Sequence, residues 1–225
     1  QNQQQGEEIL SKCGEVLEIG LCNPAFELGY NGEKYELILS PEGNRAKLFE
    51  LVYFQRHAPA AVLEHWNIWV GRQPSHGFHL RSDDWEISGQ DVQVWPDPQE
   101  GGRVSLALYC EKLLPLMQDN ENKAWWILSV LTDQILGEVA SIALIEGFNV
   151  LDTPKAAPSV RLSELPEVVK EMGLSLENDA AAYLENSYLA YELNPVQDPD
   201  ADWRLDVYTG STRLPVLINE YMSNQ

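Results

Sequence analysis

NKAWWILSVLTDQILG, residues 122–137, has the strongest helical periodicity in the chain, and ASIALIEGFNV, residues 140–150, follows it almost directly. The apolar side chains of the first stretch recur along one helical face, at Ala124, Leu128, Leu131 and Ile135. Gly137 fits the position of a C-terminal cap, so a helix is expected to end there. The second stretch is mostly apolar and favours a central, buried strand.

Strands and helices are expected to alternate before this pair. Four earlier strands are predicted, at residues 35–39, 66–70, 91–95 and 103–109. An amphipathic helix is predicted at residues 45–57, and residues 71–90 have the composition of a loop. The order β-α-β-β-β-α-β predicts an α+β fold. If one early strand pair is a short edge or a loop, the order approaches a ferredoxin-like or split βαβ core, with an antiparallel or mixed sheet and helices on one face.

The expected domains are a core of residues 1–152 and a C-terminal α+β extension of residues 153–225, packed on the core rather than independent. The glutamine-rich residues 1–8 are expected to be frayed. The stretch PKAAP, residues 154–158, indicates a linker or crossing loop. The extension is expected to contain a helix over 163–172, a helical start to 178–193, a strand over 203–208, and a helix or strand over 214–221.

The acidity of the chain restricts the classes of partner. Its 225 residues include 15 Lys and Arg against 35 Asp and Glu, a formal net charge of −20. Residues 1–150 contain 10 basic and 22 acidic side chains and the remainder 5 and 13, so the charge is not confined to a tail. A surface of this sign repels phosphates and anionic lipids, which excludes nucleic acid and membrane as expected partners. It favours a basic protein.

The three cysteines, Cys13, Cys22 and Cys110, are too few for a disulfide framework and odd in number. No apolar run approaches the roughly 20 residues that cross a bilayer, and residues 1–8 lack the pattern of a secretory signal. These features predict reduced thiols in a cytoplasmic protein. No cofactor is expected, since the chain has no phosphate-binding loop, no dinucleotide fingerprint and no serine-nucleophile elbow.

The tryptophans supply candidate contact residues. Trp125 and Trp126 are neighbours on the predicted helix and point about 100° apart, so they cannot both face one core. We therefore expect an exposed aromatic surface there, with Trp85 as a third anchor, because tryptophan is favoured at interfaces. The acidic rim of this partner-binding surface is predicted at Asp83, Asp84 and Glu86.

Two sets of side chains are weaker candidates for catalysis. All four histidines lie between His57 and His79, and a metal site would use His76 and His79 with Asp83 and Asp84. The chain has neither the helix-spaced histidine pair nor the cysteine pairs of common zinc sites, and the alternative is that His57 caps a helix end while the others lie on surface loops.

Asp133 and Glu138 are the second set. Two carboxylates act as acid and base where burial separates their pKa values, but five positions along one helix turns them away from each other. A shared site therefore requires the helix to break at Gly137. Otherwise Glu138 belongs to an edge or a cap.

Two segments, DQILGE at residues 133–138 and WRLDVYTGSTRLPVLINEY at residues 203–221, resemble segments of uncharacterised bacterial α+β families. Some of these families accompany polymorphic toxins as cytoplasmic immunity proteins. The resemblance implies a non-enzymatic protein that works by contact. The negative charge independently favours such a role, because it speeds association with a basic partner.

Three functional interpretations remain. The leading one is an acidic binding or inhibitory module that occludes a basic protein partner, with aromatic anchors and an acidic rim. The second is a metal-dependent hydrolase that uses the histidine and aspartate cluster. The third is a structural protein whose exposed tryptophan surface is a homodimer seam.

Overall fold

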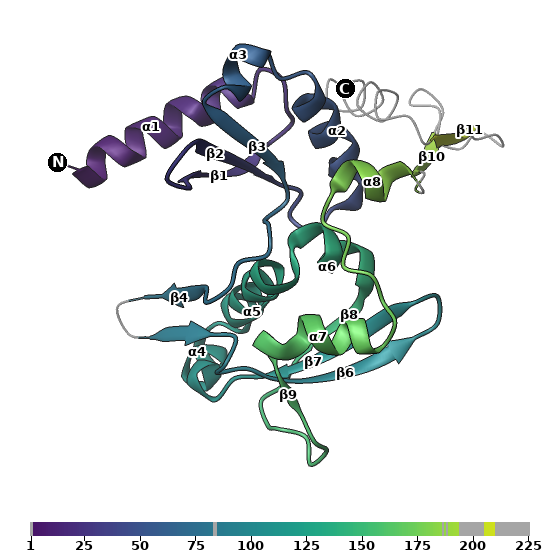
Figure 1. The fold of residues 1–225 in the computed structure, drawn as a ribbon. Helices are drawn as coiled ribbons and strands as arrows, with labels where there is room; N and C mark the ends of the chain where they lie inside the picture. The colour runs from purple at the N-terminus through teal and green to yellow at the C-terminus, as the bar shows by residue number, and fades with distance from the viewer. Residues whose placement is uncertain (1, 83–84, 186, 188, 194–204, 210–225) are drawn as a thin grey trace. The chain divides into compact units, whose positions relative to one another are not determined.

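The structure is a computed structural model that describes residues 2–82, 85–185, 187, 189–193 and 205–209, with the backbone alone at 2–5, 189–193 and 205–209. The chain divides into two compact units. Unit 1 comprises Gln1–Val70 and Asp179–Gln225, and unit 2 comprises Gly71–Asn178. Both contain helices and β-structure, so the protein has the α+β fold that the sequence predicts (Figure 1).

The boundaries of these units differ from the division expected from the sequence. They fall after Val70 and after Asn178, whereas the composition placed one boundary at residue 152. The PKAAP stretch lies in a loop inside unit 2, and the strand that follows it, β9 (Val160–Arg161), pairs with β6 (Gln93–Gln99). Proline and small residues therefore form a crossing loop here and do not separate two domains.

Unit 1 contains a three-stranded sheet in the order β1-β2-β3. Strands β1 (Ala25–Tyr30) and β2 (Tyr35–Ser40) form an antiparallel hairpin, and β3 (Trp66–Val70) pairs with β2 in parallel. Asn31 shapes the hairpin turn, because its Oδ1 accepts the backbone N–H groups of residue 33 at 3.0 Å and residue 34 at 2.9 Å. The sequence predicted β2 and β3 but not β1.

Two helices cross the sheet of unit 1 between β2 and β3. Helix α2 (Arg45–Arg56) begins at Asn44, whose side chain accepts the N–H of Ala46, and α3 (Ala60–Leu63) begins after Pro59. A crossover of this kind is required because parallel strands cannot be joined by a tight turn. Helix α2 contacts both β3 and α8 (Ala180–Glu185).

The N-terminal residues do not behave as the sequence suggested. Helix α1 spans Asn2–Leu17, so the expected frayed leader 1–8 is helical from residue 2. Glutamine and glutamate have good helix propensity, and this polar segment continues into the apolar turns that end at the buried Leu17. An ion pair one helical turn apart, Lys12 to Glu8 at 2.7 Å, lies on its exposed side.

The last part of unit 1 is described only in pieces. Strands β10 (Leu189–Leu193) and β11 (Leu205–Thr209) pair antiparallel, and β11 corresponds to the strand expected at 203–208. The expected helical start of 178–193 is α8. The helix or strand expected over 214–221, with most of the segment 203–221 that carried a family resemblance, lies outside the described residues.

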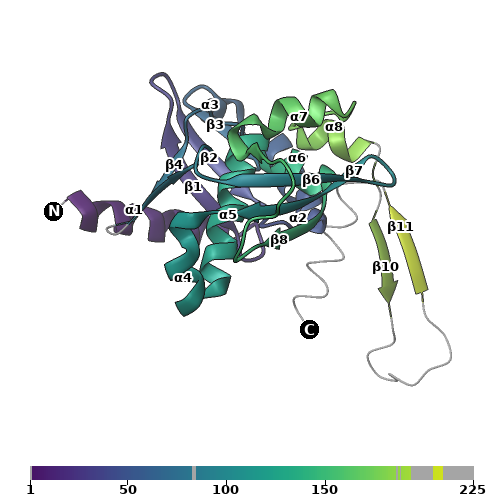
Figure 2. The same ribbon diagram turned by 90° about the horizontal axis from the view of Figure 1, so that it is seen from below.

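Unit 2 contains a four-stranded sheet in the order β8-β7-β6-β9, in which β7 (Arg103–Tyr109) is antiparallel to β6 and parallel to β8 (Ile145–Val150). The view from below shows β6 and β7 side by side (Figure 2). Strand β6 continues through Pro96 and Pro98, beyond the strand and turn predicted there. Because β9 pairs only with its first two residues, the proline positions lie at an open edge, where a missing N–H is tolerated.

A ferredoxin-like core is not confirmed. The predicted elements divide between two sheets: β2, α2 and β3 belong to unit 1, while β6, β7 and β8 belong to unit 2. Residues 71–90, expected to be a loop, include a short hairpin of β4 (His79–Arg81) and β5 (Glu86–Ser88).

The helices of unit 2 connect β7 to β8 and follow β9. They are α4 (Leu114–Asp119), α5 (Glu121–Leu136), α6 (Glu138–Leu144) and α7 (Leu165–Glu171), with single 3-10 turns at Glu111–Leu113 and Leu162–Glu164. Helix α5 is the helix predicted at 122–137. The predicted strand 140–150 is wrong in its first half, which is α6, because a short apolar run does not distinguish a buried helix from a buried strand.

The core of unit 2 packs α5 and α7 against the sheet and includes Leu106, Leu108, Leu128 and Leu131. Within the described residues, no single helix has the length and hydropathy to cross a membrane. Helices α5 and α6 reach these values only together, and a bend of 104° separates them.

Candidate functional site

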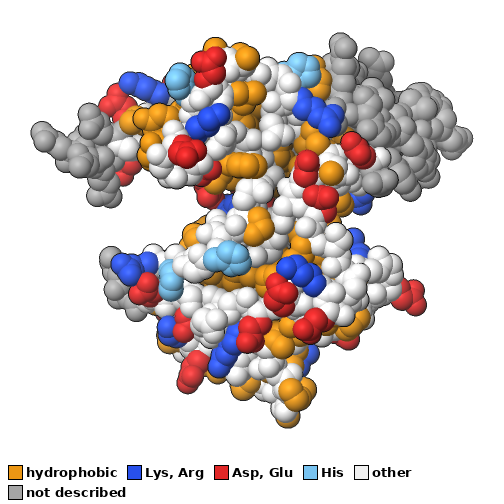
Figure 3. Space-filling view, in the orientation of Figure 1, with side chains coloured by type: hydrophobic (Ala, Val, Ile, Leu, Met, Phe, Trp, Pro, Cys, Tyr) orange, Lys and Arg blue, Asp and Glu red, His pale blue; other side chains and the backbone are white. Residues whose placement is uncertain are grey.

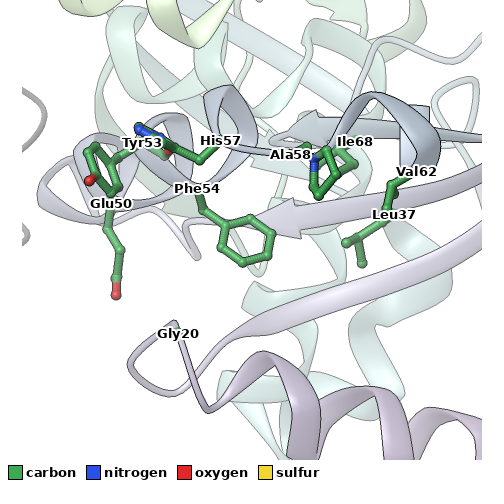
Figure 4. A pocket seen from close by; sticks show the side chains of 10 residues that line it. Gly20, Leu37, Glu50, Tyr53, Phe54, His57, Ala58, Val62 and Ile68 are labelled. Atoms are coloured by element: carbon green, nitrogen blue, oxygen red, sulfur yellow. The ribbon is translucent and has the colours of Figure 1, made fainter. Parts of the chain in front are cut away.

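Unit 1 contains a cavity of about 340 Å³ on the helix-bearing face of its sheet. Figure 4 shows side chains of α2 at the left, the strand residues Leu37 and Ile68 at the right, and the turn at Gly20 below the α2 side chains. Its lining residues are Gly20, Leu37, Glu50, Tyr53, Phe54, His57, Ala58, Pro59, Val62 and Ile68. We call this cavity the unit 1 pocket.

The pattern of α2 explains why the pocket forms there. One face of the helix is buried in the core through Leu48, Phe49, Leu51 and Val52. A second face presents Glu50, Tyr53, Phe54 and His57 to the pocket, at positions i, i+3, i+4 and i+7. Leu37 and Ile68, which pair across β2 and β3, supply the floor.

Hydrogen bonds fix the pocket walls before any ligand binds. The Gln55 side chain donates to the Ile68 carbonyl at 2.6 Å, which ties α2 to β3. The Cys22 backbone N–H donates to the Glu50 carboxylate at 3.0 Å, which ties the turn after α1 to α2. Lys34 donates to the Leu63 carbonyl at 2.6 Å and holds α3 beside the hairpin.

His57 is held as part of the wall. Its ring lies 4.2 Å from that of Tyr53, centroid to centroid, and its Nδ1 is 2.7 Å from the Tyr53 carbonyl oxygen. A carbonyl only accepts, so Nδ1 is the donor in this contact. The prediction that His57 lies at a helix end is confirmed, since it is the C-terminal cap of α2.

An aromatic row continues the same face of the sheet beyond the pocket. The ring centroids of Tyr30 and Tyr35 are 5.3 Å apart, and those of Tyr35 and Trp66 are 5.1 Å apart. Tyr35 precedes Leu37 by two positions and Trp66 precedes Ile68 by two, so the row and the pocket floor share one face. Tyr30 and Tyr35 are 60% and 54% exposed.

Further exposed apolar side chains lie in unit 1, and acidic residues are interspersed among them. Ile9, Val16 and Ile19 are exposed on and after α1, as are Val62 and Leu63 on α3. Residues 1–70 contain ten acidic and five basic side chains. Figure 3 shows hydrophobic patches with charged groups between them on the face presented. Apolar surface bordered by charge is the composition of an interaction site.

A second, different arrangement lies at the bend between α5 and α6 in unit 2. Gly137 sits there at φ 88°, and the Asn178 side chain occupies the space that a Cβ at Gly137 would fill. Asn178 donates to the Leu136 carbonyl at 2.8 Å and accepts the Ala140 N–H at 3.2 Å. The helix ends that the bend exposes are therefore capped by a residue distant in sequence.

The bend brings Asp133 and Glu138 to the same arginine, which is the condition that their joint action required. Arg72 Nη1 lies 3.8 Å from Asp133 Oδ2 and 3.5 Å from Glu138 Oε1. The Glu138 carboxylate also accepts the Arg72 backbone N–H at 3.0 Å, and the Glu138 N–H donates to the Arg72 carbonyl at 2.9 Å. Glu138 is 1% exposed. We call these three side chains the elbow cluster.

Burial, together with a smaller contribution from the negative charge of Glu138, raises the pKa of Asp133 to about 7. The Ser141 hydroxyl and the Arg72 guanidinium lower it by less. The geometry of Ser141 falls short of a full hydrogen bond, since its buried hydroxyl has no such partner among the described residues. The cluster is thus a buried charge centre that exchanges a proton near neutral pH.

The predicted contact residues lie in unit 2. Trp125 and Trp126 are 46% and 55% exposed on α5, and the ring of Trp125 meets Phe148 edge-on at 5.5 Å. Trp85 is half-buried and packs against the core of unit 2. Glu86 is exposed but bonded to Arg81 at 2.8 Å, which lowers the pKa of its carboxyl. Asp83 and Asp84 lie outside the described residues.

The histidine candidates for a metal site are both exposed. His79 is on β4, with its Nδ1 3.8 Å from a Glu86 oxygen, and His76 precedes it in a turn. In the parts of the chain that the structure describes, no group of three His, Cys, Asp or Glu side chains could hold a metal ion. Their expected partners Asp83 and Asp84 are not among those residues.

Sequence reasoning missed the unit 1 pocket, although a signal for it was present. The spacing of Glu50, Tyr53, Phe54 and His57 gives α2 a second stripe beside its core-facing one.

Comparison with protein-family models, with curated proteins and with solved structures finds no match to this chain. The assignment of a site therefore depends on its geometry.

The bend predicts a specific requirement for glycine. Replacing Gly137 with Ala forces a Cβ to within 1.9 Å of the Asn178 side chain at a φ of 88°. We expect the free energy of unfolding to fall by roughly 2–4 kcal/mol, measured by chemical denaturation. Gly6→Ala is the matched control: nothing lies within 4 Å of its Cβ, and its stability should be unchanged or slightly higher. Equal effects of the two substitutions would contradict the assignment.

The elbow cluster predicts a pH-dependent stability. Because the pKa of Asp133 is about 7 when folded and 3.8 ordinarily, the folded state keeps a proton that the unfolded state loses between these values. The free energy of unfolding should therefore fall as pH rises from about 4 to about 7. A difference of one in pKa corresponds to about 1.4 kcal/mol, so the rise from 3.8 to about 7 corresponds to a total on the order of 4–5 kcal/mol.

Asp133→Asn should remove most of this dependence and be more stable than the wild type at pH about 8. Denaturation curves across this pH range measure it. Asp119→Asn, which removes an exposed carboxyl at the end of α4, is the control and should follow the wild type. A constant difference between Asp133→Asn and the wild type at all pH values would show that Asp133 does not titrate as described.

Proposed function

We propose that this protein is a non-enzymatic binding module that acts by contact with a basic protein partner, and that its contact surface is the helix-bearing face of unit 1. The observation that carries the proposal is the combination on this unit of a preformed pocket, an exposed aromatic row and exposed apolar side chains. Exposed apolar groups do not stabilise a monomer, whereas their burial by a partner lowers the free energy because apolar surface leaves water.

The charge of the chain supports a basic partner. Residues 1–70 have twice as many acidic as basic side chains, and the whole chain has a net charge of −20. Complementary charge raises the association rate and discriminates against acidic competitors, while apolar contacts supply most of the affinity. The proposed occupant is accordingly an amphipathic segment with lysine or arginine beside its apolar side chains.

The exposed tryptophans of α5 are the alternative contact surface for the same function. Trp125 and Trp126 are both about half exposed, and tryptophan is enriched among residues that dominate binding energy. They lie in unit 2, whereas the pocket lies in unit 1. Binding data can separate the two surfaces, since no residue is shared between them.

The proposal predicts selective binding of a cationic amphipathic peptide. A helical lysine/leucine peptide should bind the full chain, and its glutamate/leucine twin should not, as measured by isothermal titration calorimetry. Affinity should fall between about 50 mM and about 500 mM salt because screening weakens the charge attraction. Equal affinity for the twins, or none for either, would refute the proposal.

Variants assign the surface in the same titration. Ile19→Lys with Val62→Lys places positive charge among exposed apolar residues of unit 1 and should weaken binding by about tenfold or more. Trp125→Ser with Trp126→Ser is the control and should bind as the wild type does. The reverse outcome would keep the contact function but move the surface to α5.

A further inference from the structure

We infer that the unit 1 pocket is an anchoring site for one aromatic side chain, of phenylalanine or tryptophan size, from a basic partner segment. This inference rests on the proposed contact function and adds to it the chemistry of the recognised group.

The pocket is suited to a single ring. Its volume of about 340 Å³ is at the small end of ligand cavities, which run from about 300 to about 1,000 Å³. The rings of Tyr53, Phe54 and His57 form one wall, and the aliphatic Leu37 and Ile68 form the floor. Aromatic groups gain additional attraction against such rings in stacked or edge-on geometry.

Its walls are already positioned. Gln55 ties α2 to β3, the Cys22 N–H binds the Glu50 carboxylate, and His57 is bonded and stacked against Tyr53. A ligand therefore does not have to order these side chains when it binds. Lower ordering cost is what distinguishes an anchoring pocket from a surface dimple.

Gly20 keeps the side of the pocket facing α2 open. A Cβ at this position would lie 3.8 Å from Cε2 and 4.0 Å from Cδ2 of Phe54, at ordinary contact distance. The φ of Gly20 is outside the left-handed region, so the backbone does not require glycine. A larger side chain here would extend from the turn towards Phe54 and fill the pocket with little backbone strain.

The surroundings favour a side chain of a partner over a free small molecule. Val62, on the pocket rim, is 38% exposed, and the exposed Tyr35 continues the floor outward. A free ligand of pocket size would leave this apolar surface in water. A segment whose ring enters the pocket would cover it, and its basic flanks would meet the acidic surface of unit 1.

The first experiment adds one aromatic residue to the cationic probe. Two lysine/leucine peptides differ only at a central position, which is 5-fluorotryptophan in one and alanine in the other. The aromatic peptide should bind the full chain about tenfold or more tightly, and its fluorine resonance should shift and broaden. Gly20→Leu should abolish this preference. The rim variant Val62→Gln should reduce it.

Gly6→Leu is the control, because it adds the same side chain at a glycine of α1 whose Cβ would have nothing within 4 Å. It should retain the preference. Circular dichroism verifies that each variant is folded. If Gly20→Leu does not fold, Val62→Gln still tests the pocket. Equal affinity of the two peptides for the wild type, or a preference that survives in both folded pocket variants, would overturn the inference.

The second experiment probes the pocket alone with 5-fluoroindole. If 5-fluoroindole binds the wild type and Gly6→Leu at millimolar concentration but does not bind Gly20→Leu, the result supports a ring-sized site. Failure of both peptides to bind would refute the proposed function, but it would not change this result. No binding of 5-fluoroindole would overturn the inference while leaving the binding of cationic peptides intact. Binding of 5-fluoroindole with equal affinity of the two peptides would assign the pocket to a free molecule and overturn the anchoring role.

Discussion

The parallel pairing of β2 with β3 is the constraint on which unit 1 depends. Parallel strands need a long crossover, and here residues 41–65 supply it as α2 and the single turn of α3. Helix α2 has apolar or aromatic side chains on two faces, but the sheet can cover only one of them. The second face is covered by the turn at Gly20 and by α3, and both are too short to close over it. The pocket is the space left by this shortfall.

The corresponding constraint in unit 2 is the burial of two carboxylates beside one arginine. Such a cluster carries a residual negative charge unless one acid is protonated, and desolvation assigns that proton to Asp133. Glu138 is the first residue of α6, where the helix dipole favours negative charge. Arg72 and Asn178 lie near the two ends of unit 2, and both are bonded to this bend. Residues 71–178 thus have ends fixed at one point, as expected of a compact structural unit.

The success of sequence reasoning follows the length and regularity of each segment. Helix α5, helix α2 and strands β2 and β3 were predictable because their patterns repeat over several turns or alternate cleanly. The strand expected over 140–150 failed because the chain turns at Gly137 and continues as α6, which depends on Asn178 far along the sequence. A local pattern contains no information about such a partner.

The candidate site shows the same limit more strongly. Helix geometry predicted that Trp125 and Trp126 cannot both face one core, but it did not predict that both are about half exposed. The pocket needed the pairing of Leu37 with Ile68 and the position of Gly20 opposite α2, which only the tertiary fold supplies. Of the elbow cluster, Asp133 and Glu138 were recognised as a conditional pair, but Arg72 was not, because it lies 61 positions before Asp133.

The high net charge bears on why apolar groups remain exposed on this chain. Two copies with −20 each repel when they approach, over a range of about 8 Å at physiological ionic strength. Repulsion of this kind disfavours self-association through the apolar surface of unit 1. It therefore argues against a homodimer seam and does not argue against a basic partner. The same carboxylates would attract the cationic segment proposed as the partner, so charge would select this partner before apolar contacts form. Exposed apolar surface is therefore compatible with a dispersed protein here, because its acidity restricts which molecules reach it.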